Sequence, residues 1–339
     1  MKVVRFVLVG LGARFRIWRR VLEERGDCRL VGFVDVDPER VSAALAQAPE
    51  AVGGSTLEGV IEKTDADVAL LCTPPGGRGG QIEAACRAGL AILAEKPLAD
   101  SLAEAEAWVA AAAAAGVPLS VGLNFRYLAV TQALKALFTE DRLGAPEFGR
   151  FTYERWRDGH RPELNKYPLK MPQPMLWEQS IHHFDLMRFV YEAEPLEISA
   201  RTFNPSWSMY EGDANVSALI TFRGGIEVTY QGTWAGNWRR MGFEWRTECV
   251  HGVALQRDMF GALGFARRDD PDLTPVPLPE EERWLDDARG LMDDFVGHLL
   301  EGTPLPCSGA DHLGSLRMVD ACIRSVGGGG AVRLDESGD

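Results

Sequence analysis

Residues 3–15 read VVRFVLVGLGARF, an apolar run that leads directly into a glycine turn, and RIWRRVLEER follows at residues 16–25. A buried strand, a glycine turn and a helix in this order cradle the pyrophosphate of a dinucleotide at the helix N-terminus. The fingerprint of such loops is G-x-G-x-x-G. Gly10 and Gly12 fill its first two glycine positions, whereas Phe15 stands in the third.

The third glycine of the fingerprint serves close packing of the helix on the strand, and the first two serve the turn and the approach of the pyrophosphate. Phe15 therefore changes the position least tied to the phosphates. We predict a working dinucleotide loop whose helix is displaced slightly from the sheet. The alternative is an ordinary α/β turn that requires glycine and binds no cofactor.

An acidic residue about 20 positions after the glycines binds the ribose of NAD in this type of unit. Asp35, at the end of the apolar run in GFVDVDP (residues 32–38), fits that position. Asp37 adds negative charge that repels the 2′-phosphate of NADP, so the sequence favours NAD. Arg14 and Arg40 leave NADP possible.

Up to residue 123, short apolar runs alternate with helical stretches, which predicts a parallel sheet covered on both faces. From residue 124 the strands are longer and alternate polar with apolar residues, which predicts an α+β domain with a mostly antiparallel sheet. A sheet with helices on one face leaves the other free, so we expect a dimer through that face. Expected strands lie in 3–10, 28–37, 67–75, 90–97, 117–124, 147–156, 195–203, 214–222 and 224–234, and expected helices near 14–25, 38–48, 78–88, 101–115, 127–139, 175–192, 284–302 and 309–330.

Composition narrows the class of protein. The length of 339 residues suits two domains, and the net charge of −13 opposes binding to nucleic acid and to anionic membranes. No apolar run is long enough to span a membrane, and the N-terminus does not resemble a signal peptide. Six cysteines without a C-x-x-C pair favour a reducing cytoplasm.

A lysine follows the fourth expected strand, in the tetrapeptide AEKP at residues 94–97. Parallel sheets bind ligands beyond the carboxyl ends of their strands, so Lys96 is expected to project toward the nicotinamide. An ammonium group there can bind a substrate hydroxyl and stabilise a developing alkoxide. The alternative is a solvated lysine before a loop proline.

A second cluster lies in WEQSIHHFD at residues 177–185. In a regular helix, Glu178, His182 and Asp185 share one face, and a carboxylate beside an imidazole can hold it as a general base. The alternative is a capped helix with a satisfied histidine. His183 points elsewhere and is expected to be structural. A metal bound by Glu178 and the two histidines is conceivable, but their mixed faces lead us to predict none.

Tryptophans are concentrated in the second half of the chain. Their faces suit the apolar faces of sugar rings, although most are expected to be core residues. We expect one or two of them near the ligand, among Trp156, Trp177, Trp207, Trp234, Trp238 and Trp245.

Together these elements resemble the Gfo/Idh/MocA oxidoreductase family. The resemblance rests on VLVGLGARFRIW, GFVDVDPER, LLCTPP, AEKPLADSLAEAE, GLNFRY, SIHHFDLMRF and the tail from DDFVGHLL onward, with E-K-P and H-x-x-D as the most specific signals. It implies a Rossmann domain at residues 1–123 and, at 124–339, an α+β substrate domain with a large open sheet that commonly oligomerises.

The resemblance also implies roles for single residues. Lys96 matches the active-site lysine of the family, Pro97 its often cis proline, and His182 the catalytic histidine with Asp185 as a supporting acid. Asn124 and Arg126 match residues that border the cofactor cleft. Three positions depart from the pattern: Glu178 where aspartate is frequent, Arg78 where histidine is frequent, and Phe15.

We therefore expect an NAD(P)-dependent oxidoreductase acting on a secondary alcohol of a sugar, polyol or sugar derivative. In this hypothesis His182 takes the hydroxyl proton, Lys96 stabilises the oxygen and Glu178 tunes the pair. Two other classes stay open, a non-catalytic NAD(P)-binding sensor and an NAD-dependent glycosidase.

The full set of expected contacts is as follows. The cofactor, NAD or NADP, is expected to contact Gly10, Gly12, Ala13, Arg14, Phe15, Asp35, Thr73, Pro74, Glu95, Lys96, Pro97, Asn124 and Arg126. The substrate is expected to contact Lys96, Tyr127, Trp177, His182 and Asp185. The expected partners are a small sugar or polyol and further copies of the chain in a homodimer or homotetramer, without nucleic acid, membrane or metal.

Overall fold

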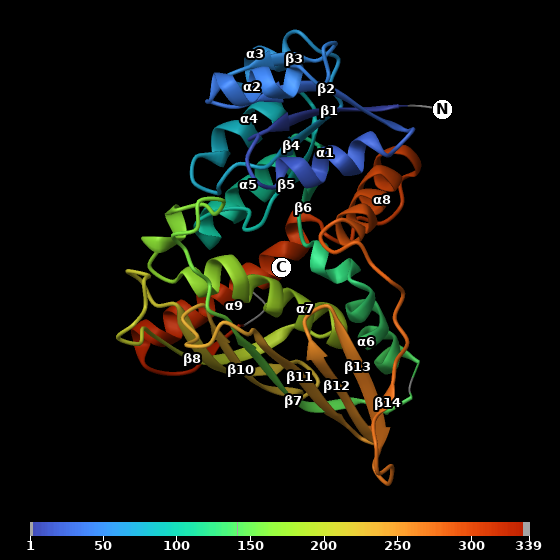
Figure 1. Ribbon diagram of the computed structural model, residues 1–339, viewed down its shortest axis with the longest axis vertical. Coiled ribbons are helices and arrows are strands. Elements are labelled where there is room, and N and C mark those ends of the chain that lie inside the picture. The colour runs from blue at the N-terminus through green and yellow to red at the C-terminus, as the bar shows by residue number, and fades with distance from the viewer. Residues whose placement is uncertain (1–2, 141, 335–339) are drawn as a thin grey trace. The chain divides into compact units, whose positions relative to one another are not determined.

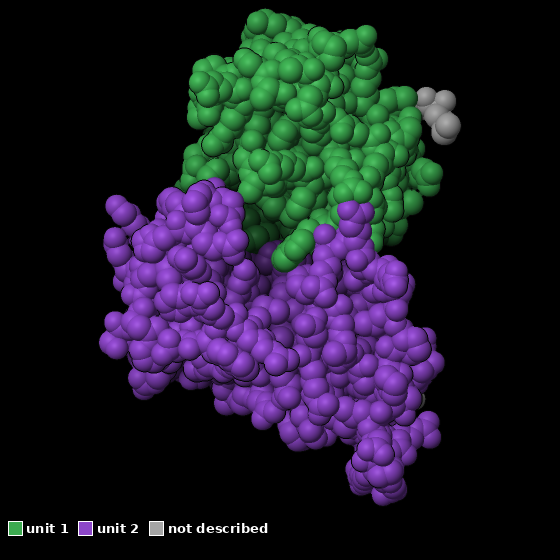
Figure 2. Space-filling model, viewed as in Figure 1, with its two compact units in different colours: residues 1–124, 284–313 green, residues 125–283, 314–339 purple. Residues whose placement is uncertain are grey.

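The computed structural model describes residues 3–140 and 142–334. Contacts divide the chain into two compact units, coloured separately in Figure 2. Unit 1 contains residues 1–124 and 284–313, and unit 2 contains residues 125–283 and 314–339. The sequence predicts a single domain from 124 to 339, whereas residues 284–313 belong to unit 1.

The return of the chain to unit 1 has a specific cause. Helix α8 (Asp286–Glu301) packs against α1 (Phe15–Glu23). Arg289 of α8 binds Glu24, which follows α1, with Nη2 to Oε2 at 2.6 Å. Contacts between residues so far apart in the sequence leave no local pattern, so the sequence cannot reveal them.

Unit 1 contains the predicted parallel sheet, with six strands in the order β3-β2-β1-β4-β5-β6. The residues of β4 and β5 are all buried, because helices cover both faces. A short strand and a short helix, β3 and α3, were not predicted, since three and five residues are too few for a clear period. The elements are β1 (Val4–Val9), α1, β2 (Cys28–Val34), α2 (Pro38–Leu45), β3 (Val52–Gly54), α3 (Leu57–Ile61), β4 (Val68–Leu71), α4 (Arg78–Arg87), β5 (Ala91–Ala94), α5 (Leu102–Ala114), β6 (Leu119–Val121) and α8.

Unit 2 contains a nine-stranded sheet in the order β14-β13-β12-β11-β7-β10-β9-β8-β15. Its strand pairs are antiparallel except for β7 with β10, which confirms the mostly antiparallel prediction. Strands β11 to β15 were not located from the sequence. The elements are η1 (Asn124–Tyr127), α6 (Ala129–Thr139), β7 (Pro146–Glu154), η2 (Tyr167–Leu169), η3 (Leu176–Ser180), α7 (Ile181–Tyr191), β8 (Pro195–Phe203), β9 (Asn215–Phe222), β10 (Glu227–Thr233), β11 (Gly242–Cys249), β12 (Gly252–Asp258), β13 (Gly261–Arg267), β14 (Thr274–Pro275), α9 (Gly309–Gly328) and β15 (Val332–Arg333). The first residue of η1, Asn124, and the first turn of α9, residues 309–313, still belong to unit 1.

Helices α6, α7 and α9 lie on one side of the nine-stranded sheet, and Figure 1 shows no helix on the other side. Side chains alternate accordingly along β7, where Phe151 and Tyr153 are buried toward the helices. Phe148 and Leu219 are exposed, at 57% and 50%. Among the described residues, no helix combines the length and the apolar character that crossing a membrane requires.

One buried carboxylate in unit 1 binds the start of α1 to the end of β5. Glu95 is only 7% exposed, and its Oε1 accepts hydrogen bonds from Arg14 Nε and Trp18 Nε1, both at 2.6 Å. Burial raises the pKa of Glu95, but the charge and hydrogen bonds of its partners outweigh burial, so the pKa lies below its ordinary value.

Because the pKa of Glu95 is lower in the folded chain than in the unfolded chain, the ionised carboxylate stabilises the fold above the unfolded pKa. This contribution is lost as the pH falls through the folded pKa. We expect Glu95→Gln to lower the free energy of unfolding by about 3 kcal/mol at pH 7, since Arg14 loses its charged partner. The difference from the wild type stays constant down to the ordinary carboxyl pKa of 4.5 and shrinks only as the pH falls below it.

Urea denaturation at a series of pH values between 7 and 3 measures this difference. The exposed residue Glu62 provides a control, because Glu62→Gln removes one charge from unit 1 without touching the Arg14–Glu95–Trp18 contact. A constant difference between Glu95→Gln and the wild type across this pH range would show that the Glu95 charge does not stabilise the fold.

Candidate active site

The glycine loop after β1 has the backbone geometry that its sequence predicts. Gly10 has a φ of +88°, and a Cβ there would lie 2.9 Å from the backbone nitrogen of Thr73, so only glycine fits. At Gly12, by contrast, no atom lies within 4 Å of the place a Cβ would take. Packing within the protein does not require this second glycine, whereas the close approach of a phosphate would.

Asp35 is fixed beside this loop at the end of β2. Its Oδ2 accepts from the Leu11 N–H at 2.7 Å, and its Oδ1 accepts from the Asp37 N–H at 2.9 Å. Arg40 Nη1 lies 3.7 Å from Oδ2. The first turn of α1 carries no acidic residue. An open glycine turn, a helix N-terminus and a fixed carboxylate together fit the pyrophosphate and ribose of NAD.

Phe15 is half-buried, and its ring meets Phe33 of β2 edge-on, with centroids 5.9 Å apart and planes at 85°. The Arg19 guanidinium lies 5.9 Å from the Phe15 ring. An aromatic pair therefore replaces the close helix–strand contact that a third glycine allows. The displacement of α1 stays a prediction.

Arg78, at the start of α4, binds the segment that carries Lys96. The Arg78 side chain is 1% exposed, and its Nη1 donates to the carbonyl oxygens of Glu95, Pro97 at 2.7 Å and Leu98 at 3.1 Å. Its Nη2 donates to the carbonyl of Thr73, which follows β4. One guanidinium thus joins the loops that follow two neighbouring strands.

The sequence analysis recorded Arg78 only as a departure from a family pattern and gave it no role. Arg78 stands at the start of the expected helix at 78–88, and nothing in that pattern marks it as a buried cation. The Leu98 N–H also donates to His312 Nε2 at 3.3 Å, from the first turn of α9. Arg78 and His312 thus both hold the segment that carries Lys96. The Lys96 side chain is half-buried, and the Lys96–Pro97 peptide is cis.

The expected continuous helix at 175–192 divides into two parts. Residues Leu176–Ser180 form a π-helical turn, and the regular helix α7 begins at Ile181. The expected α-helical spacing from Glu178 to His182 is therefore wrong, because a π turn places successive residues at different angles. His182 and Asp185 both lie in the regular helix and keep the expected spacing. Glu178 Oε1 accepts from the Tyr167 hydroxyl at 2.6 Å, and the His182 ring stacks on Phe125 with centroids 4.1 Å apart.

His183 is fully buried in a separate network, as its expected structural role requires. Its Nε2 lies 3.0 Å from Gln179 Nε2, its Nδ1 lies 2.8 Å from the Tyr230 hydroxyl, and that hydroxyl donates to Ser180 Oγ at 2.8 Å. Burial lowers the pKa of His183 to about 3. The ring is therefore neutral at physiological pH.

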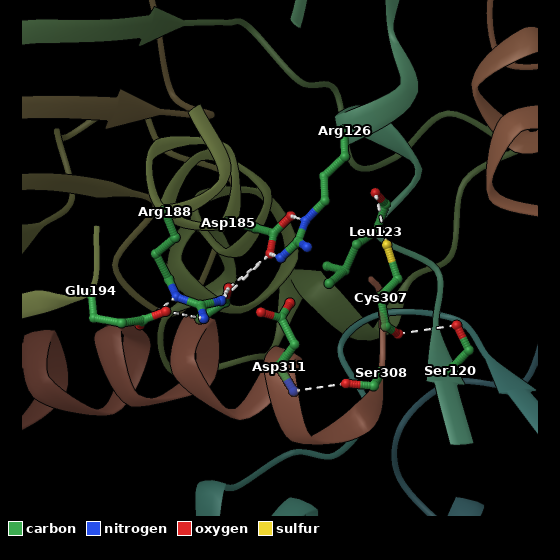
Figure 3. A network of polar contacts seen from close by, with 10 residues as sticks. Ser120, Leu123, Arg126, Asp185, Arg188, Glu194, Cys307, Ser308 and Asp311 are labelled. Carbon is green, nitrogen blue, oxygen red and sulfur yellow. Dashed lines mark hydrogen bonds and ion pairs between the residues drawn. The ribbon is translucent and has the colours of Figure 1, made fainter. Parts of the chain in front are cut away.

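Asp185 lies in a buried ion-pair network of unit 2, shown in Figure 3. Its two carboxylate oxygens accept from Arg126 Nε at 2.8 Å and Nη2 at 2.6 Å, and Oδ1 also accepts from Ser315 Oγ at 3.0 Å. Arg188 Nη1 lies 3.8 Å from Oδ1 and binds Glu194 through Nη2 at 2.6 Å. The carboxylate thus fixes Arg126, and a direct contact of Asp185 with substrate stays a prediction.

The other expected site residues have varied surroundings. Thr73 Oγ1 donates to Gln81 at 2.8 Å, and Asn124 Nδ2 donates to Asp287 of α8, which ties η1 to the returning helix. Ala13 and Pro74 are exposed, Tyr127 is half-buried, and Trp177 is 8% exposed. Over residues 3–140 and 142–334, no group of three or more His, Cys, Asp or Glu side chains is placed to hold a metal ion.

Comparison with known proteins matches two parts of the chain to domains of one family. Residues 4–123 match the oxidoreductase family with an NAD-binding Rossmann fold, Gfo/Idh/MocA, and residues 131–252 match the C-terminal domain of the same family. An inositol 2-dehydrogenase from Rhizobium meliloti (strain 1021) is 26% identical over 337 residues, which cover 95% of this chain and 97% of the relative.

Two solved structures share the fold. An oxidoreductase from Agrobacterium radiobacter, in complex with NAD+, L-tartaric acid and magnesium, aligns with a TM-score of 0.87 at 20% identity over 97% of this chain and 98% of its own. An inositol dehydrogenase homologue from Azotobacter vinelandii, complexed with NADH and myo-inositol, aligns with a TM-score of 0.83 at 19% identity over 98% of both chains. The chain therefore belongs to the Gfo/Idh/MocA family of oxidoreductases, and residues 4–123 are its NAD-binding Rossmann fold.

Proposed function

We propose that the protein is a dehydrogenase that uses NAD to oxidise a secondary alcohol of a sugar, a polyol or a sugar derivative. The observation that carries this proposal is the anchored Lys96 segment, which follows a parallel strand of the NAD-binding fold. The name of the inositol 2-dehydrogenase relative and the myo-inositol bound to the Azotobacter homologue support a polyhydroxylated substrate.

Lys96 and His182 act on the same substrate hydroxyl in this proposal. His182 accepts the hydroxyl proton as general base, with its ring held by the stack on Phe125. The Lys96 ammonium donates a hydrogen bond to the same oxygen and stabilises the negative charge that develops there. Bound NAD supplies the nicotinamide ring that accepts the hydride from the substrate carbon.

Glu178 and the cofactor loop have supporting roles in this proposal. The Tyr167 hydroxyl fixes the Glu178 carboxylate, which orients the reacting pair. Gly10 and Gly12 admit the pyrophosphate, and Asp35 accepts hydrogen bonds from the ribose hydroxyls, which favours NAD over NADP. Arg14 and Glu95 hold the loop through their mutual contact and touch the cofactor only at its border.

Single substitutions of the reacting pair test this mechanism. We expect Lys96→Ala and His182→Ala each to lower kcat/KM by about 10²- to 10⁴-fold, because each removes a group that acts in the transition state. NADH formation is measured by absorbance over a panel of sugars and polyols with NAD+. Thermal stabilisation by NAD should persist in both variants, which shows that the fold and the cofactor site are intact.

Two exposed residues serve as matched controls. Lys63→Ala and His251→Ala remove the same side-chain types from the surface and should leave turnover unchanged. Full turnover in Lys96→Ala and His182→Ala would exclude the mechanism. Tight NAD binding without turnover across the panel would indicate a sensor, and glycoside cleavage without net NADH would indicate a glycosidase.

We also propose that the protein works in the cytoplasm as a homodimer or homotetramer. All six cysteines are free thiols, which suits a reducing compartment. The helix-free face of the nine-stranded sheet exposes Phe148 and Leu219 around a hollow that Arg150, Thr229 and Arg246 also line. Large exposed apolar side chains on an open sheet favour pairing with a second copy of this face.

Leu219→Arg tests this assembly. The substitution places a cation in each copy of the proposed interface, so like charges meet across a two-fold axis and we expect the oligomer to dissociate toward the monomer. Light scattering coupled to size-exclusion chromatography gives the mass. Ala107→Arg, at an exposed position of helix α5 in unit 1, controls for the added charge away from the sheet. An unchanged mass for Leu219→Arg would place the interface elsewhere.

A further inference from the structure

The segment between β7 and the π turn is basic in an acidic protein. Residues 155–170 contain five Lys or Arg residues against two Asp or Glu residues, although the whole chain carries a net charge of −13. Some of these cations serve the segment itself. Arg161 pairs with Glu163, and Lys166 Nζ donates to the carbonyl oxygens of Gly159, at 3.2 Å, and Arg161.

Arg155 and Arg157 differ from these cations. Both side chains are half-buried, and within residues 3–140 and 142–334 neither guanidinium forms an ion pair with a carboxylate. The Arg157 guanidinium lies 4.1 Å from the centre of the Trp234 ring, and its Nη1 donates to the Tyr210 hydroxyl at 3.2 Å. Partly desolvated cations usually have an anionic partner, because burial without one is costly.

A third hydrogen-bond donor lies at the same place. Trp234 is 3% exposed, and its buried indole Nε1 makes no hydrogen bond of standard geometry in the part of the chain that the structure describes; its polar neighbour is the Tyr153 hydroxyl. Arg155, Arg157 and Trp234 surround the Tyr153 hydroxyl. Burial raises the pKa of Tyr153, while these three neighbours lower it. One hydroxyl oxygen accepts at most two hydrogen bonds, so Tyr153 cannot satisfy two guanidinium groups and an indole N–H. The surplus of donors points to a ligand that accepts hydrogen bonds.

Contacts inside unit 2 connect this donor cluster to the proposed catalytic residues. The Tyr153 ring packs on His183, the neighbour of His182, with centroids 4.8 Å apart. Tyr167, from the same basic segment, donates to Glu178. A ligand group at the cluster therefore lies on the helix side of β7, where α7 presents its histidines.

We propose that Arg155, Arg157 and the Trp234 indole N–H form an anion subsite that binds a carboxylate or phosphate group of the substrate. The subsite supplies two positive charges and one neutral donor. Asp158 acts on the Tyr210 hydroxyl that Arg157 binds, but among the described residues it forms no ion pair with either guanidinium, and its Oδ1 accepts from the His160 N–H. Planar guanidinium groups match the oxygen pairs of carboxylate and phosphate. The substrate class is then an acidic sugar derivative, a sugar acid or a sugar phosphate, instead of a neutral polyol. That the bound carboxylate or phosphate belongs to a substrate that is then oxidised rests on the proposed dehydrogenase function.

The test measures binding without turnover. The protein is saturated with NADH, and calorimetry measures the affinity for methyl β-D-glucopyranoside, its uronate and its 6-phosphate, with the galactose and mannose series alongside. These glycosides have no free aldehyde, so NADH cannot reduce them. The result is therefore independent of whether the protein is a dehydrogenase.

We expect at least one uronate or 6-phosphate to bind about tenfold or more tightly than its neutral counterpart, as charge-assisted hydrogen bonds to a partly buried site require. Tighter binding of the uronate would show that the subsite binds a carboxylate. Tighter binding of the 6-phosphate would show that it binds a phosphate. Arg155→Gln and Arg157→Gln should each abolish this preference. Arg155→Lys and Arg157→Lys, which keep the charge, should retain part of it.

Arg161→Gln is the matched control, because it removes a positive charge from the same segment at a residue paired with Glu163. It should keep the full preference. Thermal stabilisation by NAD must match the wild type in every variant, which verifies folding. Equal affinity for neutral and anionic glycosides, or a preference that survives Arg155→Gln and Arg157→Gln as it does Arg161→Gln, would overturn the proposal.

Discussion

The contacts of the Arg78 guanidinium with four backbone carbonyls are the constraint on which the proposed chemistry depends. A lysine at the end of a strand normally samples many positions, because its side chain is long and its loop is mobile. Here Arg78 binds the carbonyls of Glu95, Pro97 and Leu98 on the segment of Lys96, and that of Thr73 on the neighbouring loop. A donor that stabilises a developing negative charge is effective only when its position is fixed in advance.

The same principle extends through unit 1, where charged side chains join loops that strands alone leave separate. The Glu95 carboxylate binds Arg14 and Trp18, and Asp35 accepts from the backbone of the glycine loop at Leu11. Each charge has a partner close by, which offsets the cost of burying it. The cofactor loop, the Lys96 segment and the end of β2 are thus built as one connected set.

Much of the fold follows from local patterns. The buried runs at β1, β4 and β5, the glycine turn at Gly10 and the acid at Asp35 are all visible as short stretches of sequence, and each lies where the pattern predicts. The features that escaped prediction depend on distant partners. The return of α8 to unit 1 involves residues more than 260 positions from Glu24, and the π turn before Ile181 has no known local signal in this stretch.

The interaction partners of the charged side chains were the least predictable part of the site. The partners of the acidic side chains could not be predicted: the Glu95 carboxylate binds Arg14 and Trp18, and Asp185 is held by Arg126 and Ser315. The expected contact of Glu95 with the cofactor stays a prediction. Arg78 looked like an exception to a family pattern and is instead a buried structural cation. A sequence shows which side chains can form an ion pair, but only the fold decides which of them meet.

The positioning of Lys96 by Arg78 can be tested most directly through Arg78→Lys. An ammonium group cannot reach all four carbonyls, so the Lys96 segment loses its fixed geometry while the positive charge remains. With saturating NAD+ and the substrate that gives the highest rate of NADH formation, we predict that kcat falls about ten- to a hundredfold and that the pH dependence of kcat shifts, while circular dichroism shows that the variant is folded. An unchanged kcat and pH profile in the folded variant would contradict this account.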